Sequence, residues 1–512
     1  MQPEALSPLE QSFERWRKRA GAVLAPAAFL AVLIAPLEID GAQHRLAAVM
    51  AAVVVLWVSE ALPMPLTALL GPSACVVLQV APAKEVFAPF ADPLIFLFIG
   101  SFILARAIFL HGLDKRVAYA ALSLEWVGAR PSRILLVFGA ATAAISAWIS
   151  NTATTAMMFA IGLSLVRFLY QPRDGSAPLM HPRYATGLML MTSFSASIGG
   201  LATPVGTPPN LIGISRIRDD LGVDLQFFDW CLIGVPVVLI MYAFLFGYLN
   251  FFCPAGVHEL AGSRELITRE RAALGPWTTA QKSTLAAFIA TVCMWFAPGV
   301  IALAPTVLGA AGDPQLQDKL SAVSRSLPEG VAALIGAALL FLLPGGRTES
   351  GEKRAAITWD EAVEIDWGVV LLYGGGFAMG VLAEKVGLAA TIGNQLTAWL
   401  PEMGPFGILL AGTVIAVITS ETTSNTASAA LLTPLVIAFA RSAGVDPLPP
   451  ALGATMGASL GFMLPVSTPC NAIVYGSGMV PLTRMIRYGL LLDIVGVAVI
   501  VTVVSIVAPY LK

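Results

Sequence analysis

The chain has 512 residues, of which 57% are hydrophobic and only 12% are charged. Soluble domains carry about 25% charged residues, so this composition, with a mean hydropathy of +0.79, excludes a soluble globular protein and predicts an integral membrane protein in a lipid bilayer. The net charge of −2 comes with no basic tract, so no nucleic acid is expected as a partner. A helix needs about 20 apolar residues to cross a bilayer, so the length allows about 10–14 crossings.

The first predicted element is a membrane helix over residues 21–37. It follows a cluster of four basic residues, Arg15, Arg17, Lys18 and Arg19. A secretory signal peptide begins in a similar way, but this apolar run is long and no small-x-small cleavage site clearly follows it. Because basic residues stay on the cytoplasmic side of a membrane, residues 1–20 are expected to form a cytoplasmic segment.

Ten further crossings and two helical hairpins are predicted along the chain. The hairpins, over 134–170 and 405–440, each join two apolar arms through a polar turn. Basic residues fall mainly on one side of this arrangement, which predicts a multi-pass protein of the cell (inner or plasma) membrane with its N-terminus in the cytoplasm and its C-terminus outside. The ten crossings are expected at residues 46–62, 66–82, 92–110, 184–214, 230–252, 283–305, 328–344, 366–383, 449–478 and 486–510.

The two halves of the chain resemble each other. Ser150-Asn151-Thr152 recurs 274 positions later as Ser424-Asn425-Thr426, and the segment 204–212 recurs 261 positions later as 465–473. In the predicted topology the first hairpin opens inward and the second outward. Inverted repeats with broken helices are typical of secondary transporters, which bind their substrate where the repeats meet. The predicted fold class is therefore an all-α, inverted-repeat membrane transporter with about eleven transmembrane helices and two re-entrant hairpins.

The two Ser-Asn-Thr turns are expected to lie inside the membrane. The arm before each turn, 134–149 or 408–423, has 16 residues and would be about 24 Å long as a helix, short of the roughly 30 Å hydrocarbon core. Prolines after Thr207 and Thr468 break two further helices. The freed carbonyl, hydroxyl and amide oxygens suit a hard cation such as sodium, while helix N-termini favour an anion. A single Ser-Asn-Thr turn is usually a helix cap, but two symmetric copies favour a binding site.

The turns carry no cationic side chain. No Lys or Arg lies between Arg133 and Arg167, or between Lys385 and Arg441. An anion bound at the turns must therefore be neutralised by bound cations and helix dipoles, which predicts sodium coupling with sodium binding first. Glu421, beside the second turn, is an intramembrane carboxylate and hence a functional candidate. Bracing of the hairpin is its alternative role.

At these motifs the chain resembles the divalent anion/sodium symporter family, of the bacterial sodium-dicarboxylate cotransporter type. The resemblance covers residues 20–510 and rests on the two Ser-Asn-Thr motifs together with Ser59–Pro63, Thr67–Leu70, Gly206–Asn210 and Leu464–Pro469. It implies sodium-coupled symport of small divalent anions, most of all C4-dicarboxylates, by an elevator motion in a homodimer. The scaffold would comprise 21–133 and 253–404, the latter beginning with a cytoplasmic connector, and the mobile transport domain would comprise 134–252 and 405–512.

The resemblance also implies two sodium sites and one substrate site. The first sodium site would use Ser146, Ser150, Asn151 and Gly206, and its symmetric counterpart would use Ser420, Thr423, Asn425 and Ser467. Thr423 and Ser467 depart from the small apolar residues expected there, which implies that they bind through backbone carbonyls. The substrate carboxylates would meet Asn151, Thr152, Thr207, Pro208, Ser424, Asn425, Thr426, Thr468 and Pro469.

Other functions are weighed against this interpretation. A sodium-independent dicarboxylate or tricarboxylate exchanger would need a cationic residue near the turns. A sodium-sulfate symporter would bind the same charge, and the sequence does not fix the spacing of the anion subsites. A membrane enzyme would need a metal cluster or a nucleophile–base pair, but the five cysteines and four histidines are scattered and form no such motif. A channel would not need two sites of opposed orientation.

Overall fold

The computed structural model describes residues 8–170, 180–307, 327–347, 351–399 and 403–511. The first residues of the predicted cytoplasmic segment, 1–7, and the stretches 171–179 and 308–326 within the predicted domains lie outside the described residues. In the described part nearly all regular structure is helical, which agrees with the predicted fold class.

Apolar helices joined by short turns make up the N-terminal part. The first helix begins at Pro8, so most of the predicted cytoplasmic segment is helical. Aspartate caps open the second and fifth helices, because Asp40 and Asp92 accept hydrogen bonds from the amides of Ala42 and Leu94. These elements are α1 (Pro8–Ile34), α2 (Gly41–Ser59), α3 (Met64–Val77), α4 (Ala83–Phe87), η1 (Ala88–Ala91), α5 (Pro93–Leu110) and α6 (Leu113–Leu122).

The first repeat follows as a helical hairpin, a broken helix and a long helix. Proline at the first helical position starts three of these helices, where its missing amide costs nothing. The elements are α7 (Pro131–Ser146), α8 (Asn151–Tyr170), α9 (Pro182–Gly199), α10 (Pro208–Leu221) and α11 (Phe227–Phe252).

The stretch between the repeats contains helices at the predicted crossings 283–305, 328–344 and 366–383, and a small sheet that the sequence did not predict. Two short strands pair antiparallel, with Pro344 opposite Ala355 and Arg347 opposite Lys353. The elements are α12 (Ser263–Ala273), α13 (Thr279–Val307), α15 (Glu329–Leu342), β1 (Pro344–Arg347), β2 (Lys353–Ala355), α16 (Trp359–Ala362), α17 (Trp367–Lys385) and α18 (Leu388–Trp399).

The second repeat has the same order as the first. Its elements are α19 (Pro405–Thr422), α20 (Asn425–Ser442), α21 (Leu448–Gly457), α22 (Pro469–Tyr475), α23 (Leu482–Val507) and the closing turn η2 (Ala508–Tyr510). Of the described helices, eight are long and apolar enough to cross a membrane, and α3, α7 and α15 are apolar but shorter. The predicted number of eleven crossings stays a prediction.

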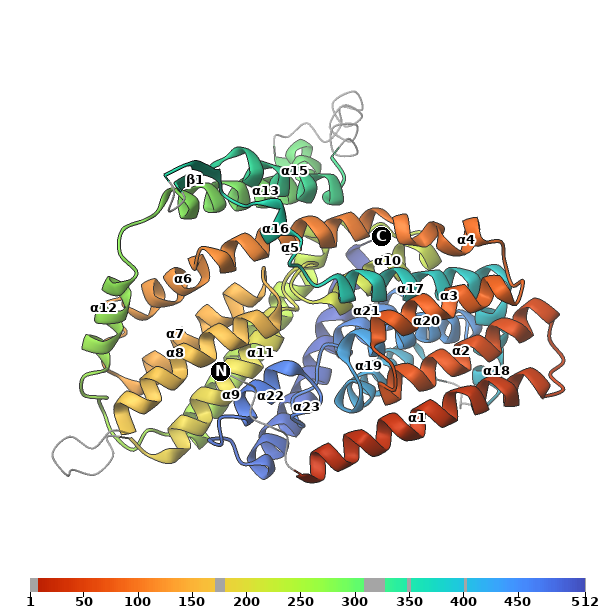
Figure 1. The fold of residues 1–512 in the computed structure, drawn as a ribbon. Helices are drawn as coiled ribbons and strands as arrows, with labels where there is room; N and C mark the ends of the chain where they lie inside the picture. The colour runs from red at the N-terminus through yellow and green to blue at the C-terminus, as the bar shows by residue number, and fades with distance from the viewer. Residues whose placement is uncertain (1–7, 171–179, 308–326, 348–350, 400–402, 512) are drawn as a thin grey trace.

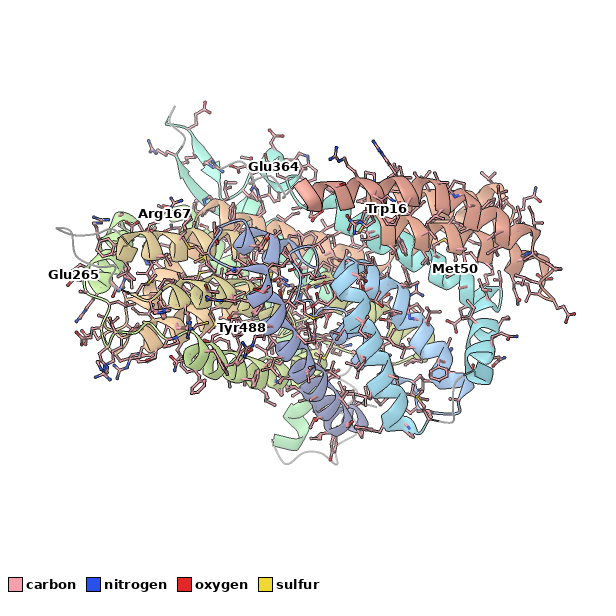
Figure 2. All side chains as sticks on the ribbon, turned by 90° about the horizontal axis from the view of Figure 1, so that it is seen from below. Trp16, Met50, Arg167, Glu265, Glu364 and Tyr488 are labelled. Atoms are coloured by element: carbon pink, nitrogen blue, oxygen red, sulfur yellow. The ribbon has the colours of Figure 1, made fainter. Side chains whose placement is uncertain are left out.

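The helices gather in two groups at opposite ends of the molecule. Figure 1 shows α1, α2, α3 and α18 at one end and α6 to α9 at the other, with α19 to α23 between them. Seen from below, Trp16 and Met50 mark the first end, and Arg167 and Glu265 mark the second (Figure 2). The apolar core likewise contains a larger and a smaller cluster of buried side chains.

A large core cluster joins helices of both repeats, and a smaller one lies mainly among α2, α3 and α17. In the large cluster the rings of Phe194 and Phe462, one from each repeat, pack edge to face with their centroids 5.2 Å apart. The two repeats therefore share one core.

Candidate functional site

Each Ser-Asn-Thr turn joins the two helices of a hairpin. The turn lies between α7 and α8 in the first repeat and between α19 and α20 in the second. The Ser150 hydroxyl accepts a hydrogen bond from the Ala153 amide at 3.3 Å, and the Ser424 hydroxyl accepts one from the Ala427 amide at 3.4 Å. The two serines are thus helix caps, and they line the cavity described below together with the asparagine and threonine of each motif.

The asparagine of each turn is fixed by the same contact. The Ser146 hydroxyl donates to Asn151 Oδ1 at 2.7 Å, and the Ser420 hydroxyl donates to Asn425 Oδ1 at 2.8 Å. Ser146 and Asn151 are both predicted ligands of the first sodium site, and Ser420 and Asn425 of the second. In each site the two residues are therefore in direct contact.

A second pair of asparagines holds the two breaks in the helices. Between α9 and α10, Asn210 Nδ2 donates to the carbonyls of Gly200 and Thr203, both at 2.8 Å. Between α21 and α22, Asn471 Nδ2 donates to the carbonyls of Gly461 and Leu464, at 2.9 and 3.0 Å. These partners occupy equivalent positions in the two repeats, so the repeat extends to individual hydrogen bonds.

The broken stretches pass directly beside the turns. A Cβ atom at Gly200 would lie 2.4 Å from Asn151 Oδ1, and one at Gly206 would lie 2.5 Å from the Gly200 carbonyl oxygen. Only glycine fits such close approaches. Predicted ligands of the first sodium site, Asn151 and Gly206, thus meet around Gly200.

The equivalent residues of the second repeat meet around Gly461. A Cβ atom there would lie 3.5 Å from both Asn425 Oδ1 and Ser420 Oγ and 3.3 Å from Ser467 Cβ. Hydroxyl, amide and carbonyl oxygens are the ligands that a hard cation prefers. Among the described residues no three His, Cys, Asp or Glu side chains gather as they would for a transition metal. Both pockets therefore fit sodium by the chemistry of their oxygens.

The hydroxyls of the two unusual ligands are already engaged. Thr423 Oγ1 donates to the Thr419 carbonyl at 2.9 Å and lies 2.8 Å from the Ser428 hydroxyl. The Ser467 hydroxyl contacts Glu421, both at its carbonyl oxygen, 2.9 Å away, and at its carboxylate. Both hydroxyls thus have protein partners, and binding of sodium through the two backbone carbonyls stays a prediction.

One cavity of about 1040 Å³ joins the two hairpin turns. All nine predicted substrate residues line it: Asn151, Thr152, Thr207, Pro208, Ser424, Asn425, Thr426, Thr468 and Pro469. Of the predicted sodium residues, Ser150, Gly206 and Ser467 also line it, whereas Ser146, Ser420 and Thr423 are buried outside its lining. The residues are brought together as the sequence predicts, while their binding roles stay predictions.

The cavity lies where the two repeats touch. Cys470, at the start of α22, lies beside the hydroxyls of Thr152, Thr155 and Ser197 in the first repeat. The Ser193 hydroxyl donates to Asn471 Oδ1 across the same boundary. Cys470 takes the place of the second proline of the first repeat and so brings a thiol to this boundary.

Charged side chains also line the cavity. Arg106 on α5 is present, but it is paired with Glu364. Glu60, paired with Arg17 at 3.0 Å, and Asp366 add two further carboxylates to the lining. Acidic groups therefore outnumber basic ones in the described lining, which favours cations more than a bare anion.

Asn210 and Asn471 are functional residues that were not predicted from the sequence. Both stand in the repeated segments 204–212 and 465–473, Asn210 directly after Pro209 and Asn471 two residues after Pro469. An asparagine shortly after the helix break in both repeats could have indicated this role. A break leaves backbone carbonyl groups without partners, and an asparagine amide can donate hydrogen bonds to them.

Comparison with known proteins gives a consistent picture. A family model described as the sodium:sulfate symporter transmembrane region matches residues 14–511. The sodium-dependent dicarboxylate transporter SdcS of Staphylococcus saprophyticus is 31% identical over 455 residues, which are 88% of this chain and 84% of that protein. SdcS of Staphylococcus aureus strain USA300 is 30% identical over 495 residues, which are 96% of this chain and 91% of that protein.

Solved transporter structures share the fold. The YdaH transporter of Alcanivorax borkumensis superposes with a TM-score of 0.53 at 14% identity, covering 98% of both chains. MtrF of Neisseria gonorrhoeae superposes with a TM-score of 0.50 at 14% identity, covering 85% of both chains. At this identity the likeness concerns the fold alone.

Proposed function

This chain belongs to the sodium:sulfate symporter family, and on that premise we propose that it is a sodium-coupled symporter of dicarboxylates, with C4-dicarboxylates as substrates. The family consists of membrane transporters, so the chain is a transporter and not an enzyme. The names of the SdcS relatives support sodium and dicarboxylates as the transported species. The observation that carries the proposal is the cavity in which two symmetric, oxygen-rich turns meet.

The substrate is bound by neutral groups in this proposal. The amides of Asn151 and Asn425 and the hydroxyls of Thr152 and Thr426 donate hydrogen bonds to the two carboxylates, one at each turn. The N-termini of α8 and α20 add their partial positive charge. Two such turns lining one cavity match a molecule with two carboxylates.

Sodium supplies the missing positive charge. Because the turns carry no cation and the cavity lining is rich in carboxylates, an anion gains little attraction from the protein alone. Sodium bound around Gly200 and Gly461 lies next to both turns and makes anion binding favourable. The alternative, a sodium-independent exchanger, lacks a free cationic side chain among the described lining residues, since Arg106 is paired with Glu364.

Transport proceeds by an elevator motion of one domain in a homodimer. The transport domain, 134–252 with 405–512, moves against the scaffold, 21–133 with 253–404. The packing of Phe194 on Phe462 joins the two repeats within the transport domain and supports their moving together. With the N-terminus in the cytoplasm and the C-terminus outside, the cavity residues Glu60, Arg106 and Asp366 stand at the inner ends of their helices, so this conformation faces inward.

A cluster of charges joins α10 of the transport domain to α17 of the scaffold. Arg216 Nη2 donates to the carbonyls of Gly376 and Phe377 at 2.9 and 3.0 Å. Asp220 lies 3.8 Å from Arg216 and beside Glu384, whose other partner is Arg441 at 3.1 Å. An elevator motion must break these contacts.

This cluster is expected to respond to pH. Burial raises the pKa of Asp220 to about 7, against the opposing charge of Arg216, and Glu384 and Asp219 add to the rise. Because this pKa lies above the ordinary value of 3.8, the folded state loses stability as the pH rises from about 4 to about 7, and the contact between Asp220 and Glu384, which needs the proton, is lost over the same range. Asp220→Asn, which does not titrate, should show a flatter pH dependence of Tm than the wild type. As a control, the exposed Asp360→Asn should keep the wild-type pH dependence of Tm. If Asp220→Asn shows the same pH dependence of Tm as the wild type, the raised pKa does not belong to Asp220.

Uptake into proteoliposomes tests the proposed function. Purified protein is reconstituted, and labelled succinate uptake is followed with an inward sodium gradient and then with choline in place of sodium. Uptake that requires sodium is the expected result. Sodium-independent uptake that needs internal dicarboxylate would instead identify an exchanger.

Sulfate is the second candidate substrate, because the family model is described by it. Excess unlabelled sulfate should leave sodium-dependent succinate uptake nearly unchanged if dicarboxylates are the substrates. Sulfate uptake without succinate uptake would identify sulfate, and not a dicarboxylate, as the substrate.

A further inference from the structure

A cluster of buried acidic groups lies behind the second Ser-Asn-Thr turn. Glu421 on α19 is 2% exposed and Asp493 on α23 is 3% exposed. The Asp493 carboxyl lies against the Glu421 carboxyl, close enough for a hydrogen bond if one of the two carried a proton. At Gly489, one turn before Asp493, a Cβ atom would lie 2.3 Å from the Phe462 carbonyl oxygen, so α23 packs directly on the broken stretch.

The two carboxyl groups differ in their partners. Glu421 Oε1 accepts a hydrogen bond from the Met463 amide at 2.8 Å, and Oε2 accepts one from the Ser467 hydroxyl. Both oxygens of Asp493 are buried, and no donor in the described part of the chain makes a hydrogen bond to either, although the Phe462 amide lies nearby. A buried polar group without a partner is costly, so this one requires an explanation.

No cationic side chain on the neighbouring helices neutralises the pair. The helices packed on α23 are α11, α19 and α21, and none of them contains Lys, Arg or His. On α23 itself the nearest base in sequence, Arg487, is about 9 Å away along the helix axis from Asp493. None of the ion pairs found among the described residues includes Glu421 or Asp493.

The first repeat shows that the hairpin architecture does not need the pair. Glu421 corresponds to Ala147, whose carbonyl accepts a hydrogen bond from the Thr203 hydroxyl, just as the Glu421 carbonyl accepts one from Ser467. The helix α11 packs on α7 and α9 as α23 packs on α19 and α21, yet it has no acidic residue after Asp229. In both repeats the carbonyl at this position is therefore bonded to the broken stretch, by donors at different positions, and in the first repeat this occurs without a buried carboxyl group there.

We propose that Glu421 and Asp493 form a third cation site, which binds a sodium ion between their carboxylates. Two carboxylates side by side in a buried site repel each other unless a shared proton or a bound cation lies between them, and carboxylate oxygens suit a hard cation. The Ser467 hydroxyl, bound to Glu421, links this site to the second hairpin site, where the Ser467 carbonyl is the available ligand. The identity of the ion rests on the proposed sodium coupling.

Equilibrium binding of radiolabelled sodium to the purified full-length protein, without substrate, tests the site. Asp493→Asn keeps the size of the side chain and removes one charge, so it should bind about one sodium ion fewer per chain than the wild type. Glu421→Gln should lose the same ion, and the double variant should lose no more than either single variant, because both act on one site. Asp114→Asn is the matched control, since Asp114 is a similarly buried aspartate, 4% exposed, on α6, and it should lose none.

The outcomes separate this inference from the proposed function. A wild type that binds no sodium contradicts the sodium coupling itself. If the wild type binds sodium and Asp493→Asn and Glu421→Gln bind as much, the third site is contradicted but the proposed sodium coupling is not. Should both variants aggregate, the wild-type count still tests the site: the two hairpin sites and the third site together require three ions per chain, and a count of two or fewer overturns the third site.

Discussion

Replacing Asn471 with leucine is expected to abolish sodium-dependent uptake and to lower Tm. Asn471 Nδ2 donates to the carbonyls of Gly461 and Leu464, and leucine has a similar volume but no donor. Two carbonyl groups inside the protein would lose their partner, at a cost of about 1–3 kcal/mol each, so the folded state should lose about 2–6 kcal/mol. The stretch that these bonds hold also carries Ser467 and Thr468, so the site would lose its shape. Uptake and thermal unfolding of the purified variant measure both effects.

The first repeat provides the matched comparison. Asn210→Leu should have a similar effect, because Asn210 makes the equivalent bonds to Gly200 and Thr203. Asn250→Leu changes an exposed asparagine on α11 and should leave uptake and Tm unchanged. If Asn471→Leu keeps wild-type uptake and Tm, the asparagines do not hold the breaks.

Alanine in place of Asn151 or Asn425 is expected to reduce sodium-dependent uptake at low substrate concentration by about 10–100-fold. Each amide is proposed to donate to a substrate carboxylate, and a hydrogen bond to a charged group contributes about 1.5–3 kcal/mol, with about 1.4 kcal/mol for each factor of ten. Each Oδ1 atom also lies at a predicted sodium pocket, beside Ser146 or Ser420. The sodium concentration for half-maximal uptake should therefore rise in both variants.

Two further variants separate substrate effects from general damage. Thr426→Val removes a hydroxyl that lines the cavity and should raise KM for succinate while leaving the sodium dependence unchanged. Thr419→Ala removes a partly exposed hydroxyl on the same hairpin, which donates to the Ile415 carbonyl one turn earlier, and should behave as wild type. If the sodium dependence of uptake is unaltered in both Asn→Ala variants, the two asparagines do not bind sodium.

Much of the site could be predicted because its signals are local in the sequence. The residues after Thr207 and Thr468 are prolines, and α10 and α22 begin at those prolines. The repeated Ser-Asn-Thr motif indicated both turns, and the motifs identified a family to which the family model also assigns the chain. Patterns within a few residues were sufficient, since proline and capping residues act on their own backbone.

Other features depend on contacts between distant residues, which a single sequence does not reveal. Glu421 and Asp493 meet because α23 packs on α19, and nothing near either residue indicates the other. Arg106 lines the cavity because the helix α5 borders the cavity. The turns themselves lack a cationic side chain, as the sequence predicted. The helix α1 extends beyond the predicted start at residue 21 because its charged first turns are also helical, where hydropathy alone gives no signal.

The central claim is that bound sodium, and not a cationic side chain, neutralises the substrate at the two turns. The most direct measurement is equilibrium binding of labelled succinate to the purified protein in sodium chloride and in potassium chloride at equal ionic strength. Saturable binding in sodium, with none detectable in potassium, is the predicted result. Binding of equal affinity in both salts would show that the protein neutralises the anion by itself, and would contradict the claim.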